Sequence, residues 1–404
     1  MKKKITVTML SILLLTGCRD GQFLPMREEI DELNLIRVIA VDKSEVHNQI
    51  KVTVTSQKAA GDSGGQSGEG EASSGNEQVI VLSSMEKTVQ AAIRHFQTYT
   101  NKHVFWGHSN FYLIGEDAAK EDIVKYLDFF ARDHNLRPNS EVYIIYGQAG
   151  DILERSNLPG FFIADFLESL KENKKYLATS GSMEVLQLMV ELDENRIFGI
   201  AVPTLSLDGE LTKAKGTQHP LTKGVRVEGY AVIKDFKLVG YINQSDSRGY
   251  NLIKNEGYKA AFDITDQEGE DVGMEIMGVQ TKIIPRVENG QLVGVRIISR
   301  IEANIDEVHT KRDIFKEDSL KYLEHQQSEV IKKEMENCVE LAKKLNADFL
   351  GIGKAVHQKH PILWERMKGQ WSELFQELDI EIKVESHINR TYDIREPNGY
   401  KSGV

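Results

Sequence analysis

Residues 279–305 read VQTKIIPRVENGQLVGVRIISRIEANI, and this stretch decides the fold of the C-terminal half of the chain. At its centre, Asn289-Gly290 is the strongest short signal for a tight β-hairpin turn. In the returning strand, apolar and polar residues alternate, as in a strand that faces a core on one side and water on the other. The residues expected on the apolar side are Val293, Val295, Ile297, Ile301, Ala303 and Ile305, and those on the polar side are Arg296, Arg300, Glu302 and Asn304. The stretch therefore predicts an antiparallel sheet with one buried face.

The surrounding sequence supplies partners for this hairpin. Residues 225–242 show a second hairpin pattern, and residues 380–388 alternate as a final strand. Apolar residues at helical spacing predict a long helix over residues 313–345. Shorter helices are expected around residues 349–358 and from Pro361, which suits a first helical position. The C-terminal region is therefore expected to be an antiparallel sheet packed on a long helix.

The N-terminal region alternates between strand and helix patterns. Apolar runs predict strands at residues 33–41, 50–54, 79–82, 105–114, 142–146 and 200–207. Helices are expected between them, the first opening with the capping box Ser83-Ser84-Met85-Glu86 and the last two around residues 161–170 and 183–192. This rhythm predicts a mixed sheet covered by helices, so the chain is assigned to the α+β class.

Composition divides the chain into segments. The expected segments are a signal peptide at residues 1–17, a tether at 18–32, an N-terminal domain at 33–207 with a flexible Gly/Ser/Glu loop at 61–76, a linker at 208–222, a C-terminal domain at 223–395 that could divide further, and a tail at 396–404. Two folded regions of unlike character are therefore expected after the leader.

The first 18 residues predict export and lipid anchoring. Three lysines precede the apolar residues 5–15, which at about 1.5 Å per residue are too short to cross a bilayer core of ~30 Å. Leu15-Thr16-Gly17-Cys18 then resembles a bacterial lipobox, in which the chain is cut after Gly17 and Cys18 carries diacylglycerol. We expect a mature chain anchored to the lipid bilayer at the outer face of the cell membrane without spanning it.

The acidic character of the chain limits its partners. Its net charge of −11 becomes −14 when the three lysines of the leader are removed. Nucleic acid is therefore not expected as a partner, and the negative charge is expected to hold the folded body away from anionic lipid. We expect the mature chain without Cys18 to be monomeric. Since Gly351-Ile352-Gly353 lacks a third glycine and follows no strand, no cofactor is expected.

Several residues could carry chemistry, and each also has a structural interpretation. His357 and His360 are spaced for shared metal ligation, but no third ligand is evident, so packing is the alternative. Trp364 and Trp371 could lie on one helix face, either in the core or as an aromatic docking patch. Cys338 falls on an apolar helix stripe, where a buried thiol would be inert.

The charged residues at positions 128–137 have no partner that would make them catalytic. Asp128 and Asp133 lack a paired base or nucleophile and are expected to pair with arginine or water. Arg132, Asp133 and Arg137 suit a salt-bridged loop, with ligand capture as the alternative. No catalytic or metal-binding residue is assigned, and an enzyme is not expected.

Several separated blocks of the mature chain form an ordered series. They are residues 27–33 (REEIDEL), 39–42 (IAVD), 107–108 (GH), 113–116 (LIGE), 129–133 (FFARD), 136–137 (LR), 347–349 (ADF) and 369–375 (GQWSELF), with Gly353, His357, Pro361 and Trp364 between the last two. In this order they resemble the Ger(x)C family of spore germination lipoproteins, the C subunits of nutrient germinant receptors. The chain departs from the family at Arg19, where a tryptophan is usual, and in the length of its Gly/Ser loop.

The resemblance implies a non-enzymatic subunit outside the inner membrane of the spore. It would assemble with the integral membrane A and B subunits of a receptor and support germination in response to nutrients. Whether this subunit binds a nutrient is left open. The alternative is a solute-binding lipoprotein that delivers a small molecule to a membrane transporter, which would have two similar lobes around a cleft.

Overall fold

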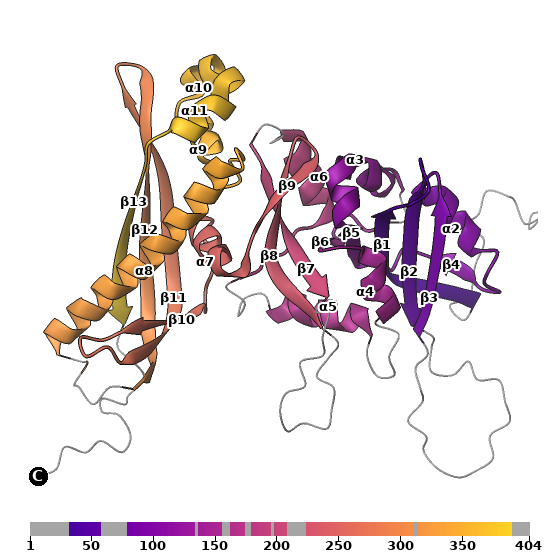
Figure 1. The fold of residues 1–404 in the computed structure, drawn as a ribbon, viewed down its shortest axis with the longest axis horizontal. Helices are drawn as coiled ribbons and strands as arrows, with labels where there is room; N and C mark the ends of the chain where they lie inside the picture. The colour runs from indigo at the N-terminus through magenta and orange to yellow at the C-terminus, as the bar shows by residue number, and fades with distance from the viewer. Residues whose placement is uncertain are drawn as a thin grey trace, which may run out of the picture.

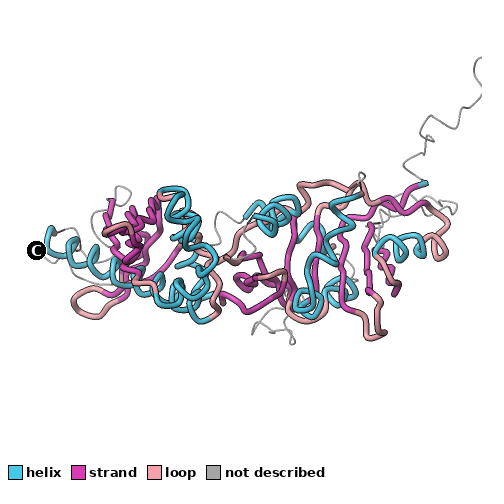
Figure 2. The backbone as a smooth tube through the Cα atoms, turned by 90° about the horizontal axis from the view of Figure 1, so that it is seen from above, coloured by secondary structure: helices cyan, strands magenta, loops and turns pink. Residues whose placement is uncertain are grey.

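The structure is a computed structural model that describes residues 32–57, 79–133, 136–155, 162–173, 179–194, 198–207, 224–309, 314 and 316–389. The leader with Cys18, the loop at 61–76, the expected linker at 208–222 and the tail at 396–404 lie outside the described residues. Figure 1 shows an elongated molecule in which two sheets follow one another along the long axis, and Figure 2 shows the same arrangement from above. The expected α+β class is confirmed.

The first sheet has nine strands. Eight of them lie in the order β3-β2-β1-β5-β6-β7-β8-β9, and β4 pairs with β1. The strands are β1 Leu33–Lys43, β2 Ile50–Gln57, β3 Val79–Glu86, β4 His103–Phe105, β5 Phe111–Gly115, β6 Glu141–Ile145, β7 Ile200–Leu207, β8 Val225–Lys234 and β9 Lys237–Ile242. Strands β1, β5, β6 and β7 are parallel to one another. Because they are covered on both faces, they read in the sequence as nearly continuous apolar runs.

Helices cover both faces of the first sheet. They are α2 Val89–Phe96, α3 Glu116–Arg132, α4 Ala149–Arg155, α5 Ile163–Asn173 and α6 Val185–Glu194. Helices α2, α3 and α6 share one hydrophobic cluster with the sheet, whereas α4 and α5 share another. The expected mixed sheet with covering helices is therefore confirmed. Helix α4, only seven residues long, was not expected because it is too short to show a helical period.

The expected capping box does not open a helix. Strand β3 continues through it, with Ser83 paired to Thr53 of β2 and the Met85 side chain exposed. Helix α2 follows Thr88 instead, whose hydroxyl accepts a hydrogen bond from Ala91 N–H at 3.1 Å. The helix therefore starts at a threonine cap further along the chain, because pairing with β2 already uses the backbone of the serines.

The single strand expected over residues 105–114 is also wrong. Ser109 N–H donates to Trp106 O at 2.8 Å, so the chain turns between β4 and β5. Both strands then pair in parallel with β1, β4 near the start of β1 and β5 along its second half. The turn lets the chain pass from one part of the β1 edge to the next.

The hairpin β8–β9 belongs to the first sheet. Strand β8 pairs antiparallel with β7, and β9 forms the edge of the sheet. The strands that directly follow the expected linker therefore complete the first sheet, and the second sheet begins only at β10. Helix α7, Gln244–Ile253, connects the two and lies between them in Figure 1.

The second sheet has the order β10-β11-β12-β13. Its strands are β10 Ala261–Thr265, β11 Asp271–Glu288, β12 Gln291–Val308 and β13 Ile380–Asn389. Asn289 and Gly290 both have positive φ angles, 51° and 75°, as the expected tight turn requires. The expected inner face of β12 is buried except for Val293, which is 40% exposed close to the turn. Because β13 runs parallel to β12, the sheet is mixed, which corrects the antiparallel expectation.

Helix α8, Glu317–Lys344, covers the inner face of the second sheet, as expected (Figure 1). Cys338 is fully buried on it, and burial raises the pKa of the thiol, so the inert interpretation is confirmed. The chain then forms α9 Ile352–Lys359, α10 Pro361–Met367, the 3₁₀ turn η3 Lys368–Gln370 and α11 Trp371–Glu377. Pro361 occupies the first turn of α10, as predicted. Among the described helices, none has both the length and the apolar character needed to cross a bilayer.

Candidate functional site

The two sheets meet at a joint between β7 and the turn that follows α8. Asp348 N–H donates to Phe198 O at 2.6 Å, which ties the turn to the residue just before β7. Gly199 has a φ of 130°, and a Cβ added there would lie 3.0 Å from the Ala347 Cβ. We call this region the interdomain joint; it comprises Phe198, Gly199, Tyr230, Lys234, Asn346, Ala347, Asp348, Gly353, Trp364 and Trp371. The missing side chain at Gly199 lets the backbones of the two halves approach closely in this joint.

An aromatic cluster fills the centre of the interdomain joint. Phe198 stacks on Trp364 with ring centroids 5.3 Å apart, and Trp371 meets Trp364 edge-on at 5.2 Å. Gly353 of α9 lies against this cluster, since a Cβ added there would be 2.9 Å from Trp371 Cε2 and would overlap the Phe198 ring. Both tryptophans are nearly fully buried, at 4% and 2% exposure. The core interpretation of the tryptophan pair is therefore confirmed, and the docking-patch alternative is wrong.

A buried carboxylate holds the start of α9 in the interdomain joint. Asp348 Oδ1 accepts hydrogen bonds from Gly351 N–H at 3.1 Å and Ile352 N–H at 2.9 Å, and Oδ2 accepts one from Gly353 N–H at 2.6 Å. Burial raises the pKa of Asp348 to about 6, against the opposing effect of these three hydrogen bonds. The side chain thus satisfies the free N–H groups of a helix start that water cannot reach.

Polar contacts close the interdomain joint on its second side. Lys234 of β8 donates from Nζ to Asn346 O and, at 3.1 Å, to Ser372 Oγ. Burial lowers the pKa of the Lys234 amine. Tyr230 Oη donates to Asn251 Oδ1 at 2.5 Å, so α7 is joined to the same strand. Asp348, Lys234 and Tyr230 hold backbone and side-chain partners across the interdomain joint, whereas Asn346 Oδ1 and Trp371 Nε1 are buried there without a partner among the described residues. The contacts that are made suit fixed orientation of the two sheets.

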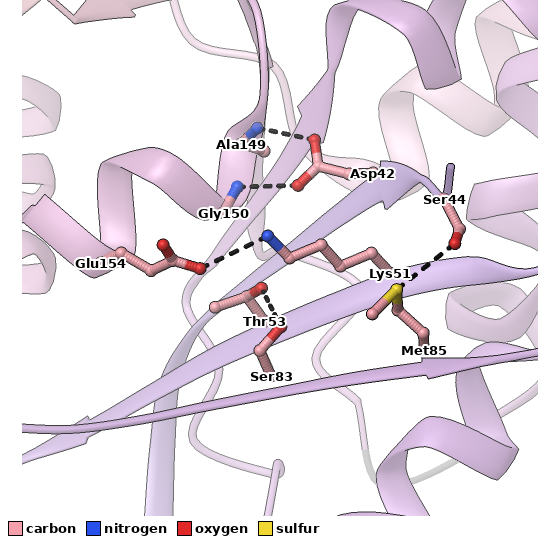
Figure 3. A network of polar contacts seen from close by, with 9 residues as sticks. All are labelled: Asp42, Ser44, Lys51, Thr53, Ser83, Met85, Ala149, Gly150 and Glu154. Atoms are coloured by element: carbon pink, nitrogen blue, oxygen red, sulfur yellow. Dashed lines mark hydrogen bonds and ion pairs between the residues drawn. The ribbon is translucent and has the colours of Figure 1, made fainter. Parts of the chain in front are cut away.

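A second buried carboxylate lies at the end of β1 in the first sheet (Figure 3). Asp42 accepts hydrogen bonds from Ala149 N–H at 2.7 Å and Gly150 N–H at 2.8 Å, at the start of α4. A Cβ added at Gly115, the end of β5, would overlap the Asp42 carboxylate. Burial raises the pKa of Asp42, against the two backbone hydrogen bonds.

This position is where open α/β sheets commonly bind ligands, outside the carboxyl ends of their parallel strands. A helix N-terminus at such an edge favours an anion, because its N–H groups are free and its dipole is positive there. Here the anion is the protein's own Asp42, with Gly115 and Gly150 giving it room. A side chain of the protein therefore occupies the position at which other open α/β sheets bind ligands.

Further polar contacts tie β2 and β3 to this corner in Figure 3. Lys51 of β2 contacts Glu154 of α4 at 3.4 Å, and Thr53 shares a hydrogen bond with Ser83 of β3 at 3.1 Å. Thr53 Oγ1 would also lie 2.9 Å from a Cβ placed at Gly150. The corner is packed as closely as a core, which leaves the carboxylate no room for a bound solute.

The histidines and charged residues singled out from the sequence occupy structural positions. His357 stacks on Trp364 with ring centroids 5.9 Å apart, and His360 O accepts from Trp364 N–H at 2.9 Å, so the packing interpretation holds. Across the described ranges, no group of three His, Cys, Asp or Glu side chains is placed to hold a metal ion. Asp128 pairs with Arg132 at 2.8 Å on α3, as expected for an arginine partner.

Arg137 contacts residues of the turn before β5. Its guanidinium approaches His108 Nδ1 at 3.1 Å and Asn110 Oδ1 at 3.4 Å. It therefore joins two of the sequence blocks that were quoted for the family, the Gly-His block and the Leu-Arg block. The contact is exposed, so it positions the loop and contributes little to stability.

Asp42 and Asp348 were quoted from the sequence without a role. Each accepts hydrogen bonds from a helix start that contains glycine. Asp42 pairs with the start of α4 at Gly150, and Asp348 pairs with the start of α9 at Gly351 and Gly353. For Asp348 the signal was local, because an acidic residue a few positions before a glycine-rich helix start is a capping pattern. For Asp42 no local signal existed, since its partner helix lies more than one hundred residues later in the chain.

Two family models match this chain. Residues 26–207 match the spore germination protein N-terminal domain, and residues 228–392 match the C-terminal domain described as spore germination B3/GerAC like. Among curated proteins, spore germination protein KC of Bacillus subtilis (strain 168) is 24% identical over 403 residues, covering 95% of this chain and 94% of that protein. Spore germination protein B3 of the same organism is 22% identical over 389 residues, covering 95% and 96%.

A solved structure has a similar fold. The crystal structure of the GerBC protein superposes on this chain with a TM-score of 0.56 at 20% sequence identity. The match covers 87% of this chain and 96% of that chain. The match therefore extends over both halves of the chain.

Proposed function

Since the chain belongs to the family of GerAC-like spore germination proteins, we propose that it is the lipid-anchored C subunit of a nutrient germinant receptor. The observation that carries this proposal is the order of the matches: both family domains occur in sequence and together account for most of the mature chain. The relatives named as spore germination proteins match over the same length.

The proposed subunit lies at the outer face of the spore inner membrane. Residues 1–17 act as the signal peptide, Cys18 carries the diacylglycerol, and residues 18–32 link the lipid to the fold. The structured body then works outside the membrane, beside the integral membrane A and B subunits. Its role is assembly with them, and through this assembly it supports the response to nutrients.

Assembly rather than catalysis is also what the described geometry favours. The buried carboxylates Asp42 and Asp348 are both engaged by backbone N–H groups at helix starts and are shielded from solvent, as structural caps are. The interdomain joint fixes two sheets as one body, and a rigid body presents its contact surfaces to a partner in a constant relation. A subunit of this kind can be displaced as a whole when its membrane partners change shape.

The solute-binding alternative has less support. Two lobes around a cleft would require two similar α/β halves. The sheets instead differ in strand number and order, nine strands against four, and share a buried core at their contact. The carboxyl edge of the first sheet, the usual ligand position, is filled by Asp42.

The proposal is tested by nutrient-triggered release of dipicolinate from spores that lack this chain. A receptor-independent germinant is the control, and complementation uses the wild-type chain and the Cys18→Ala variant. We expect loss of response to particular nutrients with the control intact, and rescue by the wild type. Unchanged responses to every nutrient, in spores that also lack its paralogues, would contradict a receptor role.

A further inference from the structure

Strand β13 is the last strand of the second sheet, at its edge. In Figure 1 it lies on the side of that sheet that faces away from the first sheet. Asp379 O accepts from Val295 N–H of β12 at 2.8 Å, and the pairing of β12 with β13 is parallel and continuous to Asn389. The backbone N–H and C=O groups of a strand alternate in direction from residue to residue. In β13, those of odd-numbered residues therefore point to β12, and those of even-numbered residues point away from it. No described strand pairs with that outer side.

Helix α8 covers both ends of this edge with side chains. Lys343 Nζ donates to Leu378 O at 2.6 Å just before β13. Glu324 Oε1 accepts from Ile388 N–H at 3.0 Å near its end. In the segment between them, centred on Val384, the outward N–H and C=O groups are not paired with any described strand.

The sequence of this edge is complementary to itself when read in the opposite direction. An antiparallel pair with its two-fold axis at Val384 places Lys383 opposite Glu385, Glu381 opposite His387 and Ile380 opposite Ile388. Lys383 and Glu385 lie on the water-facing side, with side chains 59% and 40% exposed. Opposite charges directly across an antiparallel pair are favourable, and like charges are unfavourable.

The register also suits the backbone around the axis. In an antiparallel ladder, every second pair of directly opposed residues exchanges two backbone hydrogen bonds. With the axis at Val384, the pairs with both residues pointing outward are Val384 with its own copy, Ile382 with Ser386, and Ile380 with Ile388. The last pair is incomplete, because Ile388 N–H already donates to Glu324 Oε1. The first two pairs lie between the two positions covered by α8, so Lys343 and Glu324 keep their contacts.

We propose that β13 pairs antiparallel with β13 of a second copy of this chain, around a two-fold axis at Val384. The two four-stranded sheets would then join into one sheet of twice that size. A lysine on an edge strand commonly prevents association. Here the charge alternates from Glu381 to Lys383 to Glu385, an order that matches its own reversed copy. Glu381 and Glu385 also pair with Arg296 and Arg300 of β12, so the contacts across the axis would add to these pairs.

The pairing does not require the receptor role, although anchoring would favour it. A single pair of strands is expected to give a weak dimer in solution, because isolated strand pairs are marginally stable. Anchoring through Cys18, which is part of the proposed function, would confine the copies to a surface and raise their effective concentration. The inference replaces the expectation of a monomeric mature chain.

The first test exchanges charges at the two-fold axis. Lys383→Glu places Glu opposite Glu385, and Glu385→Lys places Lys opposite Lys383, so each variant alone should lower self-association of the full chain in detergent by roughly tenfold. Mixed together, the two variants restore opposite charges at both positions and should form a heterodimer. Lys282→Glu, on the same water-facing side of β11, makes the same charge change away from the edge and should associate as the wild type does.

Sedimentation measures both results. The proposal is overturned if the wild type does not associate up to about 100 µM, or if both single variants associate as strongly as the wild type. It is also overturned if the mixture of the two variants forms no heterodimer.

The second test probes the axis in membranes. Val384→Cys lies opposite itself, where a hydrogen-bonded pair has Cα atoms about 5.5 Å apart, within disulfide range. The other two cysteines are Cys18, expected to be acylated, and Cys338, which is buried. Oxidation of membranes should give a cross-linked dimer with Val384→Cys and none with Val293→Cys at the hairpin turn. Absence of cross-linking, in membranes that retain the protein, refutes the pairing, whereas loss of the protein from the membranes refutes the anchor instead.

Discussion

Substitution of Gly353 by alanine tests whether the interdomain joint is as closely packed as it appears. The new Cβ would lie 2.9 Å from Trp371 Cε2 and would overlap the Phe198 ring, so the rings must move apart by several tenths of an ångström or more. Overpacking costs about 1–3 kcal/mol, and the overlap with the Phe198 ring places this site in the upper part of that range, at about 2–3 kcal/mol. The gain in helix propensity from glycine to alanine, about 1 kcal/mol, offsets part of it. We expect net destabilisation of about 1–2 kcal/mol.

Thermal unfolding of the purified full chain measures this effect. A loss of this size corresponds to a lower melting temperature by about 2–8 °C for a region of 150–250 residues. Two of the three tryptophans, Trp364 and Trp371, lie in the interdomain joint, so fluorescence reports on it directly. Gly369→Ala is the matched control, because no atom lies within 4 Å of the added Cβ, and this variant should melt like the wild type.

A double-mutant cycle makes the argument specific. Phe198→Ala removes the ring that the new Cβ overlaps, so Gly353→Ala should cost clearly less in that background than alone. Phe198→Ala by itself should be destabilising, by about 3–5 kcal/mol, because a large buried ring is lost. Equal melting of Gly353→Ala and the wild type, or full additivity in the double variant, would refute the packing described for the interdomain joint.

Other consequences can be measured on the same protein. The pKa of Asp348 is raised to about 6 from the usual 3.8, so folding stability from this group is present below about pH 4 and is lost as the pH rises through 6. In denaturant titrations, the free energy of unfolding of the wild type should therefore fall by up to about 3 kcal/mol between pH 4 and 7, and Asp348→Asn should remove this fall. The same pH dependence in the variant and the wild type would show that the carboxyl does not titrate in this range. Lys234→Met should lower the unfolding midpoint by the equivalent of about 1–3 kcal/mol, since Asn346 O loses its buried donor; a midpoint equal to the wild type would count against that contact. Cys18→Ala should leave the chain unprocessed or released into the medium, and recovery of a cleaved, detergent-phase protein would disprove the lipid anchor.

Long patterns with one dominant period were predicted well from the sequence. The hairpin turn at Asn289-Gly290 and the alternation of β12 are local properties of the chain, so they survive in any context. The long helix α8 was expected to within a few residues of its observed end. The last strand was also placed correctly, although its parallel direction was not foreseen, because direction depends on which neighbour it meets.

Features that depend on distant contacts were missed. The serines before Met85 have helix-capping chemistry, yet pairing with β2 uses their backbone first. Strands β8 and β9 looked like part of the second sheet because they follow a polar segment, but their pairing with β7 decides otherwise. The Asp42 contact with α4 joins residues more than one hundred positions apart, and a single sequence carries no sign of that pairing.

The shared core at the interdomain joint has a consequence for how such chains can diversify. One continuous hydrophobic cluster includes Phe198, Tyr230 and Ile242 of the first sheet together with the inner faces of β12 and α8. Recombination that exchanged whole C-terminal halves between relatives only 22–24% identical would bring together surfaces that had not changed in step. A chimera built from the N-terminal half of one such relative and the C-terminal half of another is therefore expected to be less stable than either parent, because the two sides of the shared core would no longer match.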